Sequence, residues 1–495
     1  MKQACGWRRT LQIGVALAVC AAATAAADRA SAPDAPRPRL LVLTDIGGDP
    51  DDMQSMRRLM LYSNEFEIEG LIATASGTPG ELGREVTQPD LIREIIRDYA
   101  AVRGRLLRHA AGYPTAESLL RVVRSGSAKR GVAHLGRGRS TPGSDLIIRA
   151  VDESPEPLWV AVWGGCHDLA QALFDVRAGR DPEDVARFVA KLRVYAIADQ
   201  DAQPGQPGTG EWIRNRFPEL RYVETAPPGM NRFAALFRGM YQNDSAGGGA
   251  PLIQLVRDPV IPLNQQAWVE KNVRTGHGPL GAGYPLVRQN PTSPHNTLGV
   301  KEGDTPSWFF VLPNGLGDPE HPEYGGWGGR FRKESGGHWV DAEDEHWSGS
   351  RDPAVRRKWT VARWREAYQN DFAARLDWCV AESYAAANHN PMVVLNGDGG
   401  KRILRIPARA GDPVKLSAAG SRDPDGDRLN YHWFVYREAG TCRGEVSLEA
   451  RGPEARFTAP GARRPCQIHV VCEVIDDGSP PLHSYRRAVV TVEPK

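Results

Sequence analysis

Beyond its first thirty residues, the chain lacks any apolar run close to the roughly 20 residues needed to cross a bilayer, which excludes an integral membrane protein. It also lacks an excess of charge of one sign. The 62 basic and 60 acidic residues are interspersed and leave a formal net charge of +2, which gives no case for a nucleic-acid binder. What remains is an ordinary globular composition, 41% hydrophobic and 25% charged, over 495 residues, a length that suits two domains.

Residues 1–27 have the order of features found in a secretory signal peptide. A basic start is followed by an apolar stretch and an alanine-rich end, where small residues favour cleavage after Ala27. A buried N-terminal helix is the alternative, but residues 28–38 look like a solvated linker. We therefore expect a secreted or periplasmic protein with a Sec-type signal peptide.

Cysteine is scarce, and two of the seven residues, Cys5 and Cys20, leave with the signal. Cys442, Cys466 and Cys472 lie close together near the C-terminus, so an oxidising compartment predicts one disulfide among these three. Five cysteines are an odd number, so at least one thiol stays free. Neither the spacing nor any neighbouring histidine indicates zinc.

The first part of the chain alternates short apolar runs with helical spacing. The runs cover residues 40–43, 68–73, 158–163 and 192–198, and the helical patterns cover 53–62, 168–176 and the stretch after Pro182. This alternation predicts an α/β fold with a parallel sheet covered on both faces. Such sheets bind ligands beyond the carboxyl ends of their strands, so polar clusters at these ends are candidate sites.

The pattern changes after a long helical stretch at residues 352–383, which opens on the cap signal Asp352-Pro353. Short alternating segments follow at 414–416, 429–436, 455–458, 468–475 and 488–492. They predict a small antiparallel sandwich of about 100 residues. We place the first domain at 39–388 and the sandwich at 392–495.

An acid-rich loop directly follows the first apolar run. It carries four carboxylates within eight residues: Asp45, Asp49, Asp51 and Asp52. Such a group repels itself unless a cation lies within it, and a hard cation such as Ca²⁺, with six to eight oxygen ligands, would supply that charge. The Gly47-Gly48 pair permits a tight turn into the start of a helix, where anions are favoured. A capped surface turn with solvated acids is the alternative.

Several segments together resemble a known family. They are TDIGGDPDDMQSMRRLMLYSNEFEIEGLIATAS after the first strand, WVAVWGGCHDLAQAL at 159–173, YAIADQD at 195–201, EGDTPSWFFVLPNGLGDPEHPEYGGWGGRF at 302–331 and CEVIDDGSPPLHSYRRAVV at 472–490. The acid loop is similar to the DxDxxxDDxxA signature of nucleoside hydrolases, which hold Ca²⁺ with its aspartates. The longer match resembles a secreted, nucleoside-hydrolase-like family labelled cellulose-binding, which carries a C-terminal sandwich of the Ig/cadherin-like kind.

The resemblance implies roles for the aspartates of the loop. Asp45 would bind the metal and act as the catalytic base, Asp51 would contact the sugar, and Asp52 would bind the metal. Two departures stand out: Leu43 occupies the position of the first signature aspartate, and two extra residues separate Asp45 from Asp51. Asp49 could fill the vacated position.

The resemblance also implies site residues later in the chain. His167 would supply a backbone carbonyl to the metal, although a loop histidine without such a role is the alternative. Asp304 would be the last metal ligand, with Asp318 as second choice. Asp199 and Asp201 would bind the sugar, or would only build a structural turn.

Seven of the thirteen tryptophans lie between residues 308 and 378. Trp327, Trp339 and Trp347 are candidates for a glycan-binding platform in loops, Trp327 first among them as a substrate-binding residue, whereas Trp359, Trp364 and Trp378 have the spacing of a helix core. In the sandwich, residues 421–427 resemble the loop of PKD-like and cadherin-like domains. This loop could hold a second Ca²⁺ or be a bare turn built by proline and glycine.

The function that these features predict is a secreted, calcium-dependent glycosidase that hydrolyses N- or O-glycosidic bonds through a metal-activated water. Its partner would be a saccharide or nucleoside substrate, with no nucleic acid and no integral membrane segment after signal cleavage. One alternative is a non-catalytic protein that binds an insoluble polysaccharide such as cellulose on a retired hydrolase scaffold. Another is a structural or adhesive surface protein in which the sandwich docks to a partner.

Overall fold

A computed structural model describes residues 36–48, 50–75, 85–202, 207–241, 261–286 and 299–495. The expected signal peptide at 1–27, most of the linker and Asp49 lie outside these residues. Among the helices of the described part of the chain, none combines the length and the apolar character that a membrane crossing requires.

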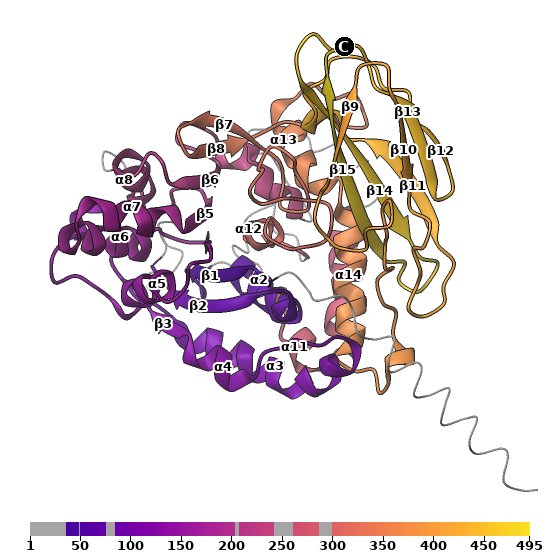
Figure 1. Ribbon diagram of the computed structural model, residues 1–495. Helices are drawn as coiled ribbons and strands as arrows, with labels where there is room; N and C mark the ends of the chain where they lie inside the picture. Colours follow the sequence, from indigo (N-terminus) through magenta and orange to yellow (C-terminus); the bar gives the residue numbers. More distant parts are fainter. Residues whose placement is uncertain (1–35, 49, 76–84, 203–206, 242–260, 287–298) are drawn as a thin grey trace, which may run out of the picture. The chain divides into compact units, whose positions relative to one another are not determined.

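An eight-stranded sheet in the order β3-β2-β1-β4-β5-β6-β8-β7 organises the first part of the chain (Figure 1). Its strands are β1 (Arg39–Thr44), β2 (Glu67–Ala73), β3 (Val123–Ser125), β4 (Leu158–Val162), β5 (Leu192–Ile197), β6 (Arg221–Thr225), β7 (Phe331–Ser335) and β8 (His338–Asp341). Neighbouring strands are parallel, except that β7 is antiparallel to β8. The predicted parallel α/β sheet is therefore confirmed, and all four expected strands lie in it.

Helices cover both faces of this sheet because its strands are apolar on both sides. In β1, Leu40 and Val42 pack into the core that includes α2 and α3, while Leu41 and Leu43 pack into the core that includes α5 and α6. The helices are α2 (Pro50–Leu61), α3 (Pro89–His109), α4 (Ala116–Arg121), α5 (Pro142–Asp152), α6 (His167–Gly179), α7 (Pro182–Ala190) and α8 (Thr209–Arg216).

Short helices lie between β6 and β7. They are η3 (Arg232–Ala234), η4 (Leu236–Met240), η5 (Ile261–Asn264), α10 (Gln266–Val269), η6 (Glu270–Arg274), α11 (Gly278–Ala282) and α12 (Thr305–Phe309). Elsewhere in the described chain are η1 (Ser63–Glu65), η2 (Val132–His134), η7 (Tyr384–Ala386) and η8 (Arg437–Ala439). Two residues of the candidate site flank these helices, since Tyr241 directly follows η4 and Asp304 directly precedes α12.

The helical stretch expected at 352–383 is two helices, α13 (Pro353–Ala362) and α14 (Arg365–Trp378). Asp352 caps α13 as predicted, since its carboxylate accepts a hydrogen bond from the Ala354 amide at 2.8 Å. The chain breaks at Trp364, whose buried ring packs against Tyr436 and Tyr485 of the C-terminal region. The helical spacing of the sequence could not reveal this packing, and it therefore predicted one helix where there are two.

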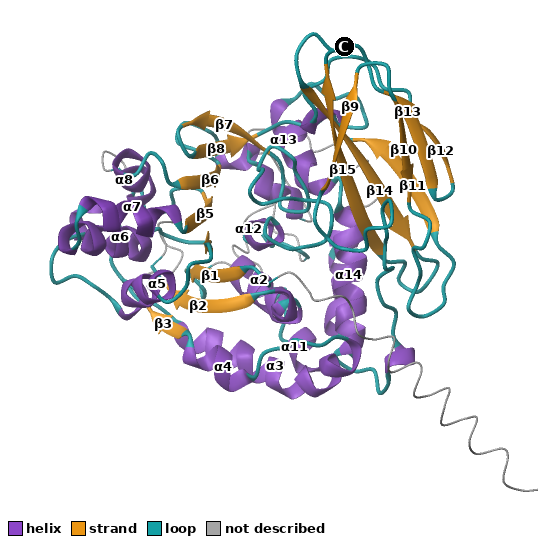
Figure 2. Cartoon of the chain, in the orientation of Figure 1, coloured by secondary structure: helices purple, strands orange, loops and turns teal. Residues whose placement is uncertain are grey.

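The C-terminal region is the predicted small sandwich, and Figure 2 shows the change to strands and loops after α14. Its sheets are β10-β13-β12 and β11-β14-β15-β9, built from β9 (Leu404–Arg409), β10 (Pro413–Ser417), β11 (Asn430–Val435), β12 (Glu449–Arg451), β13 (Glu454–Thr458), β14 (Cys466–Ile475) and β15 (His483–Glu493). The single disulfide expected here joins Cys442 to Cys466, and Cys472 is a free, buried thiol.

The second sheet of the sandwich is buried on both faces. In β14, Val470 and Cys472 point into the sandwich core, whereas Val471 belongs to the large core of the α/β part. Tyr436 and Tyr485 join Val471 in that large core. The sandwich therefore packs against the α/β part through a face that an independent domain would expose to water.

Candidate functional site

Three carboxylates from distant parts of the chain meet beyond the carboxyl end of β1. One oxygen each of Asp51, Asp52 and Asp304 lies within 4.8 Å of the other two, and we call these residues the acid triplet. Asp52 and Asp304 are buried, while Asp51 is partly exposed. The structure thus brings together two aspartates of the acid-rich loop with the one residue that the resemblance offered as the last ligand.

Each member of the acid triplet sits at the start of a helix. Asp51 and Asp52 lie in the first turn of α2, and Asp304 is the residue before α12. The positive ends of the two helix dipoles favour negative charge there. Thr44, the last residue of β1, donates its hydroxyl to Asp52, so the strand end orients one carboxylate directly.

Side chains of α2 hold the segment that carries Asp304. Gln54 accepts a hydrogen bond from the Lys301 amide at 2.6 Å, and Ser55 contacts the Thr305 hydroxyl at 3.1 Å. Arg58 forms a fully buried, bidentate ion pair with Glu302, with nitrogen–oxygen distances of 2.5 and 3.0 Å. These bonds on either side of Asp304 fix its distance from the first turn of α2.

An aromatic wall closes one side of the acid triplet. The Tyr241 hydroxyl lies 3.5 Å from Asp51, and Phe237 packs edge-on against the Tyr241 ring. Gly303 approaches both rings so closely that a Cβ there would lie 3.0 Å from each of them. The guanidinium of Arg238 lies 4.7 Å from the centre of the Tyr241 ring and forms a cation–π contact with it.

Asp341, at the end of β8, anchors the turn that carries this wall. Its carboxylate accepts a hydrogen bond from the Leu236 amide, the first of η4, at 3.1 Å. Burial raises the pKa of Asp341 to about 7. Sequence reasoning missed Asp341, as it missed Tyr241 and the Arg58–Glu302 pair. The position of Glu302, two residues before Asp304, was the sequence feature that could have indicated the ion pair with Arg58.

Asp45, predicted as base and metal ligand, is buried but lies outside the acid triplet. Its carboxylate lies against the turn after β4, where a Cβ on Gly164 would be 2.6 Å from it. Glycine is therefore required at that position. Leu43, at the position of the missing signature aspartate, is fully buried in the core shared with α5 and α6, so this position serves packing.

His167, predicted as a carbonyl ligand, is the first residue of α6, and its imidazole is not among the side chains of the acid triplet. It is buried, and its Nδ1 has no hydrogen-bond partner among the described residues. Burial lowers the pKa of His167, so the imidazole is neutral at pH 7. The neighbouring Asp168 binds the Ser127 amide at 3.0 Å and the Thr141 hydroxyl at 2.6 Å.

Asp199 and Asp201, predicted to bind sugar, hold the start of α8. Asp199 accepts hydrogen bonds from the Gly210 and Glu211 amides at 3.0 and 2.6 Å, and Asp201 accepts one from the Thr209 amide at 2.9 Å. Burial, together with the charge of Asp201, raises the pKa of Asp199 to about 7. These hydrogen bonds are those that the structural-turn alternative expects.

Asp318, the second choice for the last ligand, binds the Glu320 amide at 3.0 Å and lies 3.8 Å from Arg405 of the sandwich. Trp327, predicted as part of a glycan platform in a loop, is only 3% exposed and packs against Phe309 and Tyr485, so it does not present its ring at the surface. Of the other two candidates, Trp339 is partly buried and Trp347 is 52% exposed.

The second acid-rich loop, at 421–427, directs its oxygens to main-chain groups. Asp423 accepts hydrogen bonds from the Asp425 and Asp427 amides at 2.8 and 3.2 Å. Asp425 accepts one from the His389 amide at 2.8 Å, and Gly426 adopts a φ of 90°. These bonds are those of the bare turn.

The acid triplet fits a hard cation. Its donors are all carboxylate oxygens, the ligands that Ca²⁺ prefers. Two of the three carboxylates are buried, and three negative charges at such short distances repel one another unless a cation lies between them. Oxygens bound to one Ca²⁺ at 2.3–2.6 Å can lie at most about 5 Å apart. The observed spacing of 4.8 Å or less meets that limit.

Residues 39–331 match a family described as cellulose-binding Sde182, nucleoside hydrolase-like domain, and residues 413–492 match the C-terminal domain of cellulose-binding protein Sde0182. A solved structure of a nucleoside hydrolase-related hypothetical protein from Saccharophagus degradans, described as associated with carbohydrate metabolism, is 32% identical. The match covers 92% of this chain and 100% of that one, with a TM-score of 0.74.

Two further solved structures show only low structural similarity to the chain. Cadherin domains of protocadherin gamma B2 are 25% identical over 21% of this chain and 26% of that one, with a TM-score of 0.16. The effector protein XOO4466 is 11% identical over 74% of this chain and 99% of that one, with a TM-score of 0.29. The comparison with curated proteins returned no match.

Proposed function

The chain belongs to the cellulose-binding Sde182 family, whose larger domain is nucleoside hydrolase-like, and from that premise we propose that it is a secreted, calcium-dependent hydrolase of glycosyl bonds. The observation that supports this proposal is the acid triplet of Asp51, Asp52 and Asp304 at the carboxyl edge of the parallel sheet. The substrate class is a saccharide or a nucleoside.

Asp51, Asp52 and Asp304 would hold the ion. A bound hard divalent cation supplies charge that neutralises these carboxylates and makes water easier to deprotonate. Asp45, buried beside the turn after β4, is the residue that we assign as general base. Glycosyl cleavage develops positive charge on the sugar, and a group of carboxylates stabilises that charge electrostatically.

Aromatic residues beside the acid triplet would contact the substrate. Tyr241 and Phe237 give one side an aromatic face against which a sugar or a base can lie. Asp341 positions η4 beneath this face by binding the Leu236 amide.

Calorimetric titration of residues 28–495 with Ca²⁺ tests the metal centre. We expect one site in the wild-type chain, and we expect Asp52→Asn to abolish it because this substitution removes one anionic ligand. Asp318→Asn is the matched control and should bind as wild type, since Asp318 contacts Glu320 and Arg405 instead. No binding by the wild-type chain, or equal binding by Asp52→Asn, contradicts the proposal.

Turnover separates the base from the ligands. In a screen of ribosides and glycosides, Asp45→Asn should lose activity by about 10²–10⁴-fold, the usual contribution of general-base catalysis. Because Asp45 lies outside the acid triplet, this variant should retain Ca²⁺ binding. Full activity of Asp45→Asn would remove its assignment as base.

Polysaccharide binding without catalysis is the second candidate, and the exposed Trp347 favours it. Its side chain is 52% exposed, and an indole face stacks on sugar rings. Retention on insoluble cellulose should fall in Trp347→Ala and persist in Leu107→Ala, which removes an exposed but non-aromatic side chain. Equal retention by both variants would dismiss aromatic stacking at Trp347.

We also propose that residues 1–27 direct export of the chain. N-terminal sequencing of the exported protein checks this, and we expect it to begin at Asp28.

A further inference from the structure

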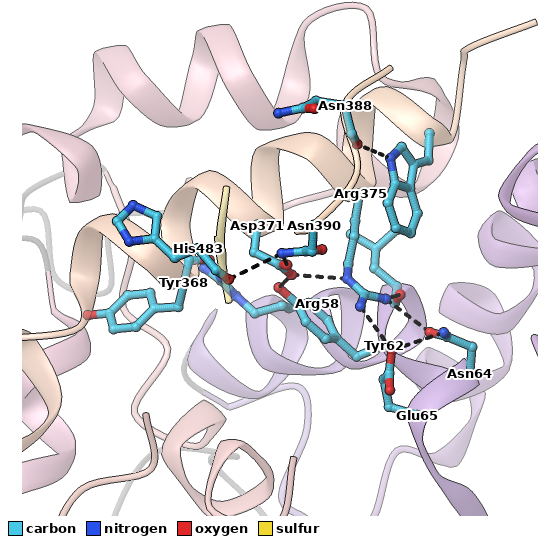
Figure 3. Close-up of polar contacts among 12 residues, drawn as sticks. Arg58, Tyr62, Asn64, Glu65, Tyr368, Asp371, Arg375, Asn388, Asn390 and His483 are labelled. Atoms are coloured by element: carbon cyan, nitrogen blue, oxygen red, sulfur yellow. Dashed lines mark hydrogen bonds and ion pairs between the residues drawn. The ribbon is translucent and has the colours of Figure 1, made fainter. Parts of the chain in front are cut away.

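Helix α14 is bonded to the sandwich by two asparagines, as Figure 3 shows in part. Asn370 donates its side-chain amide to the Pro481 carbonyl at 3.0 Å. Asn390, beyond the helix, donates to the Asp371 carboxylate at 3.0 Å and lies 3.4 Å from the His483 carbonyl at the start of β15. The loop between β14 and β15 is therefore tied to the middle of α14.

The same stretch of α14 is bonded to the end of α2. The other oxygen of Asp371 accepts hydrogen bonds from the Tyr62 hydroxyl at 2.5 Å and from Arg375 at 3.0 Å (Figure 3). Arg375 also donates to the Leu61 carbonyl at 2.9 Å and to the Asn64 side chain at 3.0 Å. One carboxylate thus bridges the sandwich side and the α2 side of the helix.

The connection continues from α14 to the acid triplet. Arg58, fully buried on α2, donates to the Gln369 side chain at 2.7 Å and to the Tyr368 carbonyl at 3.2 Å. Its guanidinium also stacks on Phe372 at 3.7 Å from the ring centre. The same guanidinium forms the ion pair with Glu302 next to Asp304. Helix α2 therefore contacts α14 directly, and the segment that carries Asp304 is linked to α14 through Arg58.

The sandwich also contributes charge to this junction. Lys401 of the sandwich lies 3.5 Å from Glu65, just beyond α2, and Arg375 lies 3.1 Å from it. Burial would raise the pKa of Glu65, but these two cations lower it to about 2. Arg375 and Glu65 are largely shielded from water, so removing either one leaves the other without compensation.

We propose that the sandwich is a buttress for the acid triplet, and that Asn370 and Asn390 are the positioning residues through which it holds α14 against α2. The part of the proposal that concerns Ca²⁺ affinity rests on the proposed function, while the part that concerns the order of α2 does not. Plain packing of two domains, without influence on α2, is the opposing view.

Hydrogen exchange on metal-free residues 28–495 tests the buttress without relying on the ion. In the double variant Asn370→Ala/Asn390→Ala, exchange in peptides covering 50–62 and 299–309 should rise about tenfold or more, as expected for two lost hydrogen bonds of ordinary strength. Peptides from β4 and β5 should exchange as in wild type. Circular dichroism checks folding, and the single variants serve if the double variant does not fold.

Arg405→Ala is the matched control because Arg405 also joins the sandwich to the α/β part, through His321 at 3.1 Å and Tyr324 at 3.3 Å, away from α2. It should leave exchange in 50–62 unchanged. Exchange in α2 that is unchanged in the asparagine variants, or raised equally by Arg405→Ala, overturns the proposal.

Ca²⁺ titration of the same proteins extends the test. If the wild-type chain binds Ca²⁺, the double variant should bind it about tenfold more weakly, although neither asparagine contacts the acid triplet. Wild-type affinity in the double variant would overturn the coupling to the site. If the wild-type chain binds no Ca²⁺, the proposed function fails, and the exchange result alone decides the buttress.

Discussion

Two loops of this chain carry several aspartates each, and they use them differently. The loop at 45–52 contributes two carboxylates to a group completed by Asp304, about 250 residues further along the chain. The loop at 421–427 binds its own main-chain amides and the His389 amide. Among the described residues, only the first loop has carboxylate oxygens close enough to those of another segment to form a group that could hold a metal ion.

The supports of the two loops differ in the same way. Buried bonds such as the Arg58–Glu302 pair assemble the first loop. The second loop combines bonds within the loop with long-range bonds to residues 389–394, among them those to the His389 and Val394 amides. We therefore expect the first loop to depend on a buried charge outside it, whereas the exposed Arg428–Asp477 pair beside the second loop should matter little.

The largest effect should come from Arg58→Met. This substitution leaves Glu302 buried without its counter-charge, which costs about 3–5 kcal/mol in the free energy of unfolding. Arg428→Met beside the second loop removes an exposed pair with Asp477 and should cost less than about 0.5 kcal/mol. Urea denaturation followed by circular dichroism measures both, and equal losses would end the contrast between the loops.

Acid should affect the two regions in opposite directions. Glu65, near α2, has a pKa lowered to about 2, so the stability it contributes is present above about pH 4.5 and is lost as pH falls toward 2. This contribution is on the order of 3 kcal/mol. The pKa of Asp427 is raised by burial and by the charges of Asp423 and Asp477, so its ionisation lowers stability as pH rises.

Unfolding free energies between pH 3 and 7 check this opposition. Glu65→Gln should be less stable than wild type at pH 7, and this difference should shrink as the pH falls from about 4.5 to 3. Asp427→Asn should be slightly more stable than wild type at pH 7, and this difference should disappear in acid. Parallel pH profiles for the two variants would contradict the expected signs.

Ca²⁺ affinity should sharpen the comparison further. Asp304→Asn removes a buried member of the acid triplet and should weaken binding by about 100-fold or more. Asp425→Asn, in the second loop, should leave the titration unchanged because its carboxylate binds the His389 amide. Weaker binding in Asp425→Asn would place a cation in the sandwich loop after all.

The smallest effect should come from Asp423→Ala. This change removes the acceptor for two amides of its own loop and should cost about 1 kcal/mol, comparable to a lost helix cap. Asp423→Asn keeps an acceptor oxygen and should cost less. Differential scanning calorimetry can rank the variants, and equal melting temperatures for Asp423→Ala and wild type would show that the turn forms without these bonds.

The sheet was predictable because parallel strands buried on both faces read as continuous apolar runs, as in Leu158–Val162. Four strands of this sheet were not predicted, β3, β6, β7 and β8. In β7 the reason is that most of its residues are exposed and charged. The break at Trp364 and the burial of Trp327 depend on the sandwich packing against them, and a helical period or a glycine-rich setting carries no information about that partner.

The candidate site was predictable only in its parts. The acid loop could be found from its charge, and Asp304 from the resemblance, but whether Asp45 or Asp51 stands beside Asp304 depends on the path of a loop with two extra residues. Asp199 and Asp201 follow a strand as sugar ligands would, yet amides of α8 take their oxygens. Whether a carboxylate binds main-chain amides or a ligand depends on the tertiary structure around it, which the sequence pattern does not show.

The sandwich sheet with two buried faces has a consequence for inheritance. A module that recombination moves from protein to protein must present a water-compatible surface wherever it arrives. Here Tyr436, Val471 and Tyr485 lie in the core of the α/β part. A crossover near residues 388–391 would expose these side chains to water and would leave a cavity in the α/β part. The two halves are therefore expected to descend together, as one evolutionary unit rather than as interchangeable pieces.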